Sequence, residues 1–302
     1  MSSTTRSLSI AFIAVLIHAC MPPLKNPHPD VHGHRGCRGL MPENSLPAFL
    51  KAVDIGCDYL ELDLVISGDG QLVVSHEPWM NEAICLTPDG DDLTLDEGRA
   101  LNLYRMTVAE IQQYDCGSRD QGRFPDQELR NTYKPTLREV VEAVDEHALM
   151  SGAVSPSYNI EIKSDPAWYG IMQPRPEPYA EAVLATIDSL GIASRCIVQS
   201  FDPAILEAVR AQRNDITLAL LVENKDGLNK NLERLTFKPD IYSPHFELVD
   251  GPLLEKLREK EIELVVWTVN EEKDIQRMLK LGVDGIISDY PDRVIAELEG
   301  QD

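Results

Sequence analysis

CIVQSFDPAILEAVR, residues 196–210, carries the signals of a short strand followed directly by a helix. Its first part, Cys196–Phe201, is a short run of mostly β-branched and small residues that predicts a strand. The apolar spacing of Pro203–Arg210 predicts an amphipathic helix, and Asp202-Pro203 is a typical start signal for it. The stretch therefore forms one strand–helix unit of the kind found in parallel sheets.

Similar strand–helix units follow one another from about Val31 to the C-terminus. Eight of them over about 250 residues predict an α/β fold, a closed (β/α)8 TIM barrel. The predicted strands are Val31–Gly36, Tyr59–Ile66, Tyr158–Lys163, Cys196–Phe201, Thr217–Val222, Ile241–Pro244, Glu263–Val269 and Gly285–Ser288. The predicted helices are Leu46–Ile55, Thr136–His147, Pro178–Leu190, Pro203–Arg210, Gly227–Leu235, Pro252–Lys260, Glu272–Leu281 and Pro291–Leu298.

One long connection interrupts this alternation. After the second strand, the turn Gly68-Asp69-Gly70 predicts a hairpin to a short strand at Gln71–His76, and the next helix starts only at Thr136. The insertion between them, about residues 78–134, contains a candidate helix at Thr107–Tyr114. Barrel enzymes build their sites on the loops that follow the strands, so we expect this insertion to be a lid or a substrate wall.

The N-terminus has the composition of an export signal. A polar start is followed by the apolar run Leu8–Ile17, which is too short to span a bilayer as a stable helix. Cys20 resembles the cysteine of a bacterial lipobox, which becomes the lipid-bearing first residue, but His18 stands where that motif prefers a small residue. We predict a signal peptide at 1–20, a barrel domain at 21–302 and a membrane-anchored lipoprotein facing the periplasm or cell surface. A periplasmic or secreted form and an uncleaved anchor are the alternatives.

The charge balance limits the partners. The chain has 28 Lys and Arg against 50 Asp and Glu, a formal net charge of -22. Such a surface repels nucleic acid and anionic lipid, so we expect no nucleic-acid partner and no membrane contact except through a lipid on Cys20. An anionic substrate would need a local positive site, such as a metal ion or a few inward cations.

Six cysteines occur, and Cys20 is used by the lipobox hypothesis. The remaining odd number cannot all pair within one chain, and no CxxC spacing indicates zinc. Cys85 and Cys116, both in the insertion, could form a disulfide in an oxidising compartment. Buried free thiols are expected for Cys37, Cys57 and Cys196.

Carboxylates lie at the ends of two predicted strands. Glu61 and Asp63 are two residues apart, so strand geometry points both side chains into the barrel mouth, and Glu161 and Lys163 are spaced in the same way. Inward carboxylates repel one another unless a cation lies between them. Three oxygen donors suit Mg²⁺ or Ca²⁺ better than zinc, although inward Glu and Lys could instead form a buried ion pair.

Two histidines are expected at the same mouth. His34 ends the first predicted strand and His76 follows the hairpin. Histidine can donate or accept a proton near neutral pH, and Arg35 and Lys163 offer cationic donors to phosphate oxygens. The other histidines are expected to be structural: His18, His28, His32, His147 and His245.

Several short motifs occur together in a specific order. The chain resembles the glycerophosphodiester phosphodiesterase family over essentially all of residues 31–298, with Ser45 and Ser288 where that family more often has Thr. The motifs are His34-Arg35-Gly36, Pro42-Glu43-Asn44-Ser45, Ala48-Phe49, Glu61-Leu62-Asp63, Asp69-Gly70, His76, Glu161-Ile162-Lys163, Gln199-Ser200-Phe201, Trp267-Thr268-Val269-Asn270 and the stretch 282–291.

This resemblance implies a mechanism and a set of site residues. It makes His34 and His76 the acid–base pair, and it makes Glu61, Asp63 and Glu161 the ligands of one divalent cation, Mg²⁺ or Ca²⁺. Arg35 and Lys163 would bind the phosphate. Phe201 and Trp267 would line the glycerol or alcohol pocket, although aromatic residues in a barrel are often plain packing.

The implied reaction is hydrolysis of a glycerophosphodiester to sn-glycerol 3-phosphate and an alcohol such as choline or ethanolamine. Either water or the neighbouring glycerol hydroxyl would be the nucleophile. One rival is a phosphoinositide phospholipase C or sphingomyelinase D-like lyase on the same barrel. No basic or apolar membrane-binding stretch after Cys20 favours it. A second rival is a catalytically silent surface binding protein. Every expected catalytic position is filled, which argues against this alternative.

Overall fold

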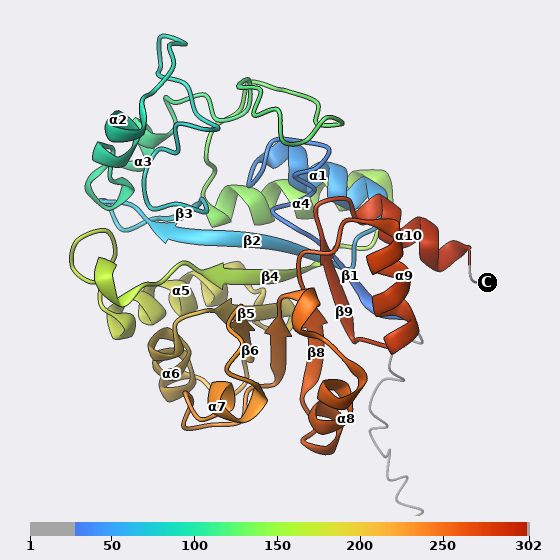
Figure 1. Ribbon diagram of the computed structural model, residues 1–302. Coiled ribbons are helices and arrows are strands. Elements are labelled where there is room, and N and C mark those ends of the chain that lie inside the picture. Colours follow the sequence, from blue (N-terminus) through green and yellow to red (C-terminus); the bar gives the residue numbers. More distant parts are fainter. Residues whose placement is uncertain (1–27, 301–302) are drawn as a thin grey trace, which may run out of the picture.

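The computed structural model describes residues 28–300 of the 302-residue chain. In this part of the chain, eight parallel strands form a barrel and helices surround it (Figure 1). The predicted TIM barrel is therefore confirmed. The predicted signal peptide, with Cys20, lies outside the described residues.

Parallel pairing runs around the whole barrel. The order of the sheet is β1-β9-β8-β7-β6-β5-β4-β2-β3, and an additional β1–β2 pairing closes it. His32 of β1 pairs with Tyr59 on one side and with Ile287 on the other. The strands are β1 Asp30–Gly33, β2 Tyr59–Ile66, β3 Leu72–Val74, β4 Ser157–Ile162, β5 Cys196–Ser200, β6 Thr217–Val222, β7 Ile241–Pro244, β8 Glu263–Val266 and β9 Gly285–Ser288. Only β3 among these is antiparallel, paired with β2 as the hairpin prediction required.

Helices follow the strands and are fixed by local capping. Ser45, Thr136 and Asp202 each accept a hydrogen bond from a backbone N–H of the first turn. Gly56 and Gly191 end two helices in the left-handed conformation. The barrel helices are α1 Leu46–Ile55, α4 Leu137–Ser151, α5 Pro176–Leu190, α6 Pro203–Gln212, α7 Leu228–Leu232, α8 Gly251–Glu259, α9 Glu272–Leu281 and α10 Pro291–Glu299.

Alternate residues of each strand supply two separate cores. Ile197 of β5 belongs to a small cluster inside the barrel, whereas the next residue, Val198, packs in the large cluster between strands and helices. The inner cluster contains Ile197, Ala219, Ile241, Val265 and Ile287. These side chains fill the interior of the barrel. The polar residues at the next inward-facing positions of the strands therefore lie at the mouth of the barrel.

Several predicted strands are too long at their carboxyl ends. The first ends at Gly33 rather than Gly36, because Arg35 and Gly36 take positive φ angles of 50° and 86° and turn the chain away. A Cβ on Gly36 would lie 2.7 Å from the carbonyl carbon of Ala48, so this turn requires glycine. The predicted strand Glu263–Val269 similarly ends at Val266. His34 and Arg35 therefore lie in the loop after β1, and Trp267 lies directly after β8.

The insertion between β3 and α4 has its own small core. It contains α2 Leu95–Ala100, a 3-10 turn at Leu103–Arg105 and α3 Val108–Ile111, so the candidate helix Thr107–Tyr114 is shorter than expected. The disulfide between Cys85 and Cys116 is present, and both sulfurs lie in this core. Figure 1 shows α2 and α3 beyond the carboxyl end of β2. None of the described helices combines the length and apolar composition that crossing a bilayer requires.

Candidate active site

A cavity of about 320 Å³ opens at the carboxyl ends of the barrel strands. It is lined by residues within or directly after the barrel strands, and by Arg123 of the insertion. Asp63, one of the nine candidate residues from the sequence, lies directly beside this cavity. The other eight line it: His34, Arg35, Glu61, His76, Glu161, Lys163, Phe201 and Trp267.

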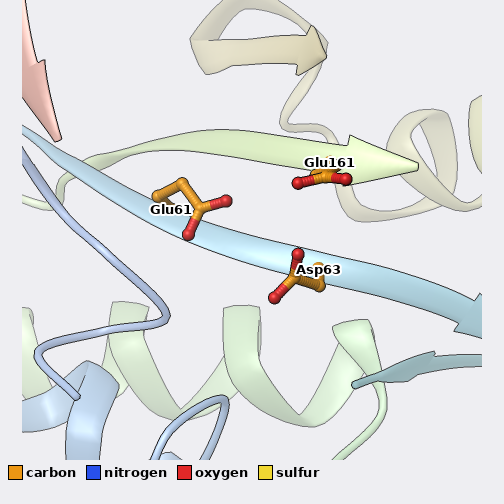
Figure 2. Close-up of side chains that lie close together, drawn as sticks. All are labelled: Glu61, Asp63 and Glu161. Atoms are coloured by element: carbon orange, nitrogen blue, oxygen red, sulfur yellow. The ribbon is translucent and has the colours of Figure 1, made fainter. Parts of the chain in front are cut away.

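Three carboxylates converge at one side of the cavity. Glu61 and Asp63 lie on β2, and Asp63 pairs with Glu161 of β4 in the parallel register. One oxygen from each residue lies within 4.8 Å of the others, and all three residues are buried (Figure 2). Alternation along β2 and parallel pairing with β4 therefore bring the three carboxylates together, as the sequence predicts.

The charges of this triad are unfavourable without a cation. Burial raises the pKa of Glu61 well above its ordinary value, and repulsion by Asp63 and Glu161 raises it further. Burial likewise raises the pKa of Glu161. The amide oxygen of Gln199, which lines the cavity, is buried without a hydrogen-bond partner in the described part of the chain. This all-oxygen donor set fits a hard divalent cation such as Mg²⁺ or Ca²⁺.

Two cations lie against the triad and are themselves held by it. Lys163 Nζ lies 2.7 Å from Glu161 Oε1 and 3.7 Å from Asp63 Oδ1. Arg35 Nε lies 3.2 Å from Asp63 Oδ2. Burial alone would raise the pKa of Asp63, but Arg35, His76 and Lys163 together hold it below its ordinary value. The ion pair considered from the sequence exists for Glu161.

Glu61 differs from the other two carboxylates. It accepts hydrogen bonds from the backbone N–H of Arg35 at 2.9 Å and from the Gln199 amide at 3.0 Å. Within residues 28–300, no Lys or Arg side chain forms an ion pair with it; its nearest basic atom is His34 Nε2 at 3.9 Å. A lysine–glutamate ion pair therefore does not account for the whole triad.

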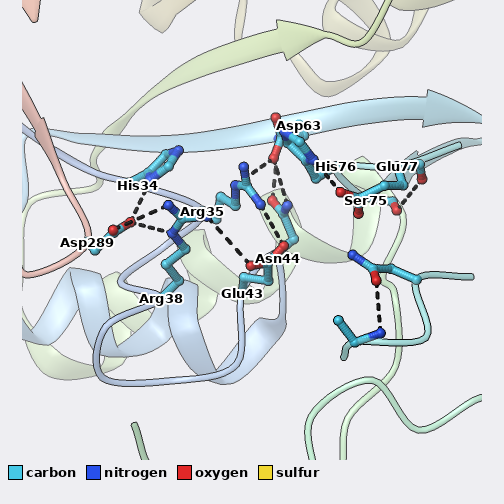
Figure 3. A network of polar contacts seen from close by, with 12 residues as sticks. His34, Arg35, Arg38, Glu43, Asn44, Asp63, Ser75, His76, Glu77 and Asp289 are labelled. Carbon is cyan, nitrogen blue, oxygen red and sulfur yellow. Dashed lines mark hydrogen bonds and ion pairs between the residues drawn. The ribbon is translucent and has the colours of Figure 1, made fainter. Parts of the chain in front are cut away.

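His34 is oriented by a carboxylate from the last strand. Its Nδ1 lies 2.6 Å from Asp289 Oδ1, and Arg38 Nε lies 2.5 Å from the same oxygen (Figure 3). Burial and Arg38 lower the pKa of His34 to about 4, against the opposing effect of Asp289. The pKa of Asp289 is held below its ordinary value by His34 and Arg38 despite burial. An ionised Asp289 requires the Nδ1–H tautomer, which leaves Nε2 able to accept a proton.

His76 has a comparable arrangement on the other side of the triad. Its Nδ1 lies 2.7 Å from Glu77 Oε1. Burial would raise the pKa of Glu77, but the hydrogen bond from His76 lowers it to about 2. The hydroxyl of Ser75 donates to the Glu77 carbonyl at 2.7 Å, and the buried Lys134 ammonium donates to that hydroxyl at 2.9 Å. One ring nitrogen of each histidine is thus fixed by a carboxylate (Figure 3).

Aromatic rings form the opposite wall. Phe201 and Trp267 meet edge to face with centroids 5.4 Å apart, and Trp267 Nε1 donates to the Ser243 carbonyl at 2.8 Å. His245 packs against Trp267, also with centroids 5.4 Å apart, and lines the cavity with Glu223. His245, expected from the sequence to be structural, lies in this wall, and its structural role stays a prediction.

The other described histidines agree better with a structural role. His32 is buried beneath the mouth and stacks on Tyr59 at 4.4 Å, and desolvation lowers its pKa to about 3. His147 lies on α4, where its Nε2 is 2.6 Å from Asp54. His18 lies outside the described residues, and His28 is the first of them.

Sequence reasoning missed several residues that shape the site. Glu77 and Asp289 each contact a predicted catalytic histidine, and Arg38 donates to Asp289. Asp289 stands inside a motif already singled out, and Glu77 directly follows His76, so proximity in sequence was an available signal for both. Asn44, part of the motif Pro42-Glu43-Asn44-Ser45, donates to Asp63 Oδ2 at 2.8 Å and therefore fixes a triad carboxylate.

The chain is similar to known proteins over most of its length. A model of the "Glycerophosphoryl diester phosphodiesterase family" matches residues 34–293. The chain is 30% identical over 268 residues to a glycerophosphodiester phosphodiesterase of Caldanaerobacter subterraneus subsp. tengcongensis, covering 88% of this chain and 96% of that protein. It is 27% identical over 271 residues to a glycerophosphodiester phosphodiesterase of Bacillus subtilis, covering 86% of this chain and 83% of that one.

Solved structures give the same similarity. A putative glycerophosphoryl diester phosphodiesterase from Silicibacter pomeroyi DSS-3 superposes with a TM-score of 0.80 and 31% identity, over 92% of this chain and 95% of that one. A phosphodiesterase from Oleispira antarctica, solved with the product sn-glycerol-3-phosphate, superposes with a TM-score of 0.70 over 90% and 97% of the two chains. The identity of 22% to the second protein supports the fold alone.

Proposed function

Because the chain belongs to the glycerophosphoryl diester phosphodiesterase family, we propose that it hydrolyses glycerophosphodiesters to sn-glycerol 3-phosphate and an alcohol, using one divalent cation. The observation that carries this proposal is the triad of buried carboxylates between two oriented histidines in one cavity. The product of the Oleispira antarctica relative is the one that this reaction would release.

Glu61, Asp63 and Glu161 are the residues that would hold the cation. When bound, Mg²⁺ or Ca²⁺ would neutralise charge on the phosphate oxygens and attract an anionic diester to a strongly acidic protein. Burial and mutual repulsion raise the pKa values of Glu61 and Glu161 when no cation is bound. A bound cation would relieve this repulsion, which favours binding of the cation. Asn44 fixes Asp63 through its amide and so supports the donor geometry.

Arg35 and Lys163 supply the remaining positive charge near the triad. Each lies against a triad carboxylate and also lines the cavity. Guanidinium and ammonium groups at the edge of the cavity can donate to non-bridging phosphate oxygens, and charge developing in the transition state strengthens such bonds.

The two histidines divide the proton transfers. His34, whose Nδ1–H is used by Asp289, presents an Nε2 that accepts the proton of the attacking hydroxyl. His76, held by Glu77, then protonates the departing alcohol oxygen. The wall of Phe201 and Trp267 gives apolar surface to the carbon skeleton of the substrate.

Product analysis tests this function. The purified, Mg²⁺-loaded protein is incubated with a panel of glycerophosphodiesters, and products are followed by phosphorus NMR. We expect sn-glycerol 3-phosphate and the free alcohol. Accumulation of a cyclic phosphate as end product would support the lyase alternative, and binding without product would support the silent barrel.

We also propose export as a lipoprotein. The apolar run Leu8–Ile17 followed by Cys20 supports it. An acylated Cys20 would hold the acidic barrel at a membrane that its own charge repels.

A further inference from the structure

One loop of the insertion reaches the cavity, and backbone hydrogen bonds hold the two ends of this loop together. At the base, the Cys116 N–H donates to the Thr132 carbonyl at 2.7 Å, and the Arg130 N–H donates to the Gly117 carbonyl at 3.0 Å. We call residues 118–129 the insertion loop. Such a loop is closed at its ends and held by its own contacts, so its tip occupies a defined position.

The insertion loop is fixed on the segment that follows β1. The Gln127 amide donates to the carbonyls of Arg38 at 2.6 Å and Met41 at 3.1 Å. The Glu128 N–H donates to the Leu40 carbonyl at 2.9 Å. The insertion loop therefore packs against the same segment after β1 that contains His34 and Arg35.

Phe124 of the insertion loop lies between two guanidinium groups. The Arg38 guanidinium carbon is 5.3 Å from its ring centroid and that of Arg123 is 5.1 Å away. Tyr290 meets the same ring edge to face at 6.4 Å. Contact with the ring face stabilises cations, which allows two like charges to stand close together here.

Arg123 differs from the other cations of the cavity in its charge environment. Arg35, Arg38 and Lys163 are each bonded to buried carboxylates, at 2.7, 2.5 and 2.7 Å for their shortest contacts. Arg123 lines the same cavity, and in the described part of the chain it forms no ion pair. Desolvation and the like charge of Arg38 lower its pKa, so an incoming anion would relieve an existing repulsion.

We propose that Arg123 is a further substrate-binding residue, which contacts the phosphate of the diester from the insertion side of the cavity. Among residues 28–300 it has no ion-pair partner, so it adds attraction for an anion that the paired cations supply only in part. This proposal rests on the proposed function and gives the insertion a role in binding. As a binding residue, Arg123 would contribute to binding of ground state and transition state alike.

The test uses Arg123→Gln with sn-glycero-3-phosphocholine, whose only anionic group is the scissile phosphate. We expect KM to rise about 10-fold or more, the scale of a charge-assisted hydrogen bond, while kcat changes little. Arg123→Lys should recover part of the loss, because it keeps the charge. The matched control is Arg130→Gln, which removes an exposed guanidinium from the base of the same loop, where it pairs with Glu128.

A second measurement does not need turnover. The affinity of the Mg²⁺-loaded protein for inorganic phosphate is measured by calorimetry, and Arg123→Gln should weaken it by a similar factor while melting temperature is unchanged. This result would support phosphate contact even if no glycerophosphodiester were hydrolysed, so it separates this inference from the proposed function. Unchanged phosphate affinity, an equal loss in Arg130→Gln, no recovery with Lys, or a defect confined to substrates with an acidic alcohol group would each overturn the proposal.

Discussion

His34 Nδ1 lies 2.6 Å from Asp289 Oδ1, although the two residues are 255 positions apart in the sequence. His34 follows β1 and Asp289 follows β9, and these strands pair to close the barrel. The Asn270 amide also donates to Asp289 Oδ2 at 2.8 Å. The orientation of the proposed base therefore depends on barrel closure and on a carboxylate held by three partners.

Replacing Asp289 with Asn should impair catalysis more than substrate binding. The amide cannot stabilise the imidazolium that forms when His34 accepts a proton, and it can favour the wrong tautomer. We expect kcat to fall by roughly 10²-fold, within the range of general acid–base contributions. Steady-state kinetics with sn-glycero-3-phosphocholine measures this, with circular dichroism and melting temperature to show that the barrel is intact.

The matched control is Asp54→Asn, which changes the carboxylate beside His147 on the outside of the barrel, at 2.6 Å. This variant has the same chemistry in an exposed position and should keep full activity. Equal losses in the two variants, or none in Asp289→Asn, would contradict the role of Asp289.

Replacing either proposed catalytic histidine with alanine should strongly reduce turnover. His34→Ala and His76→Ala should each lower turnover by roughly 10²-fold or more, because a proton transfer loses its group. His147→Ala, on the outer face of α4, should do little. If a folded, metal-loaded enzyme kept its activity without one of the two, the assignment of the acid–base pair would have to change.

The fold and the triad could be predicted because both follow from short-range periodicity. Alternation along a strand places Glu61 and Asp63 on one side, and parallel pairing brings Glu161 opposite. The end of the first strand could not be predicted, because it depends on close packing of Gly36 against Ala48. The carboxylate partner of His34 could not be predicted either, because it is brought beside His34 only by the pairing of β1 with β9.

The remaining site residues depend on tertiary contacts without a periodic signal. His245 enters the cavity wall through its packing on Trp267, and a lone histidine in sequence gives no hint of that contact. Arg123 lies in an irregular insertion whose path is set by hydrogen bonds to the loop after β1. Neither position is determined by strand or helix periodicity.

The disulfide between Cys85 and Cys116 should stabilise the insertion. It closes a loop with a sequence separation of 31, and removing such a link costs about 4 kcal/mol in the chain-entropy account. A reducing agent should lower the melting temperature of the wild-type protein. The double variant Cys85→Ala, Cys116→Ala should melt lower from the start and show no further response to reductant. An unchanged wild-type melting temperature after verified reduction would contradict the prediction.

Membrane attachment through Cys20 should depend on its thiol. Cys20→Ser should release the protein from the membrane fraction, because the acidic barrel has no charge attraction for anionic lipid. Fractionation followed by mass spectrometry of the N-terminal peptide checks this. Identical fractionation of both forms, with no lipid on Cys20, would show that export follows another route.

Carboxylate variants should weaken the proposed metal site without preventing folding. Asp63→Asn and Glu161→Gln each remove one anionic donor, so a higher metal concentration should be needed for half-maximal activity. Zinc should restore less activity than Mg²⁺ or Ca²⁺, because the donor set is all oxygen. Titration of each variant with the three ions measures both effects, and unshifted midpoints would remove these residues from the metal site.

Metal dependence is decided by measuring release of sn-glycerol 3-phosphate by the wild-type protein before and after metal removal. EDTA treatment should abolish release from sn-glycero-3-phosphocholine, and added Mg²⁺ or Ca²⁺ should restore it. Full turnover in a preparation verified to be metal-free would contradict it. Arg35 and Lys163 would then suffice for phosphate binding, and Glu61, Asp63 and Glu161 would form a structural network of buried charges.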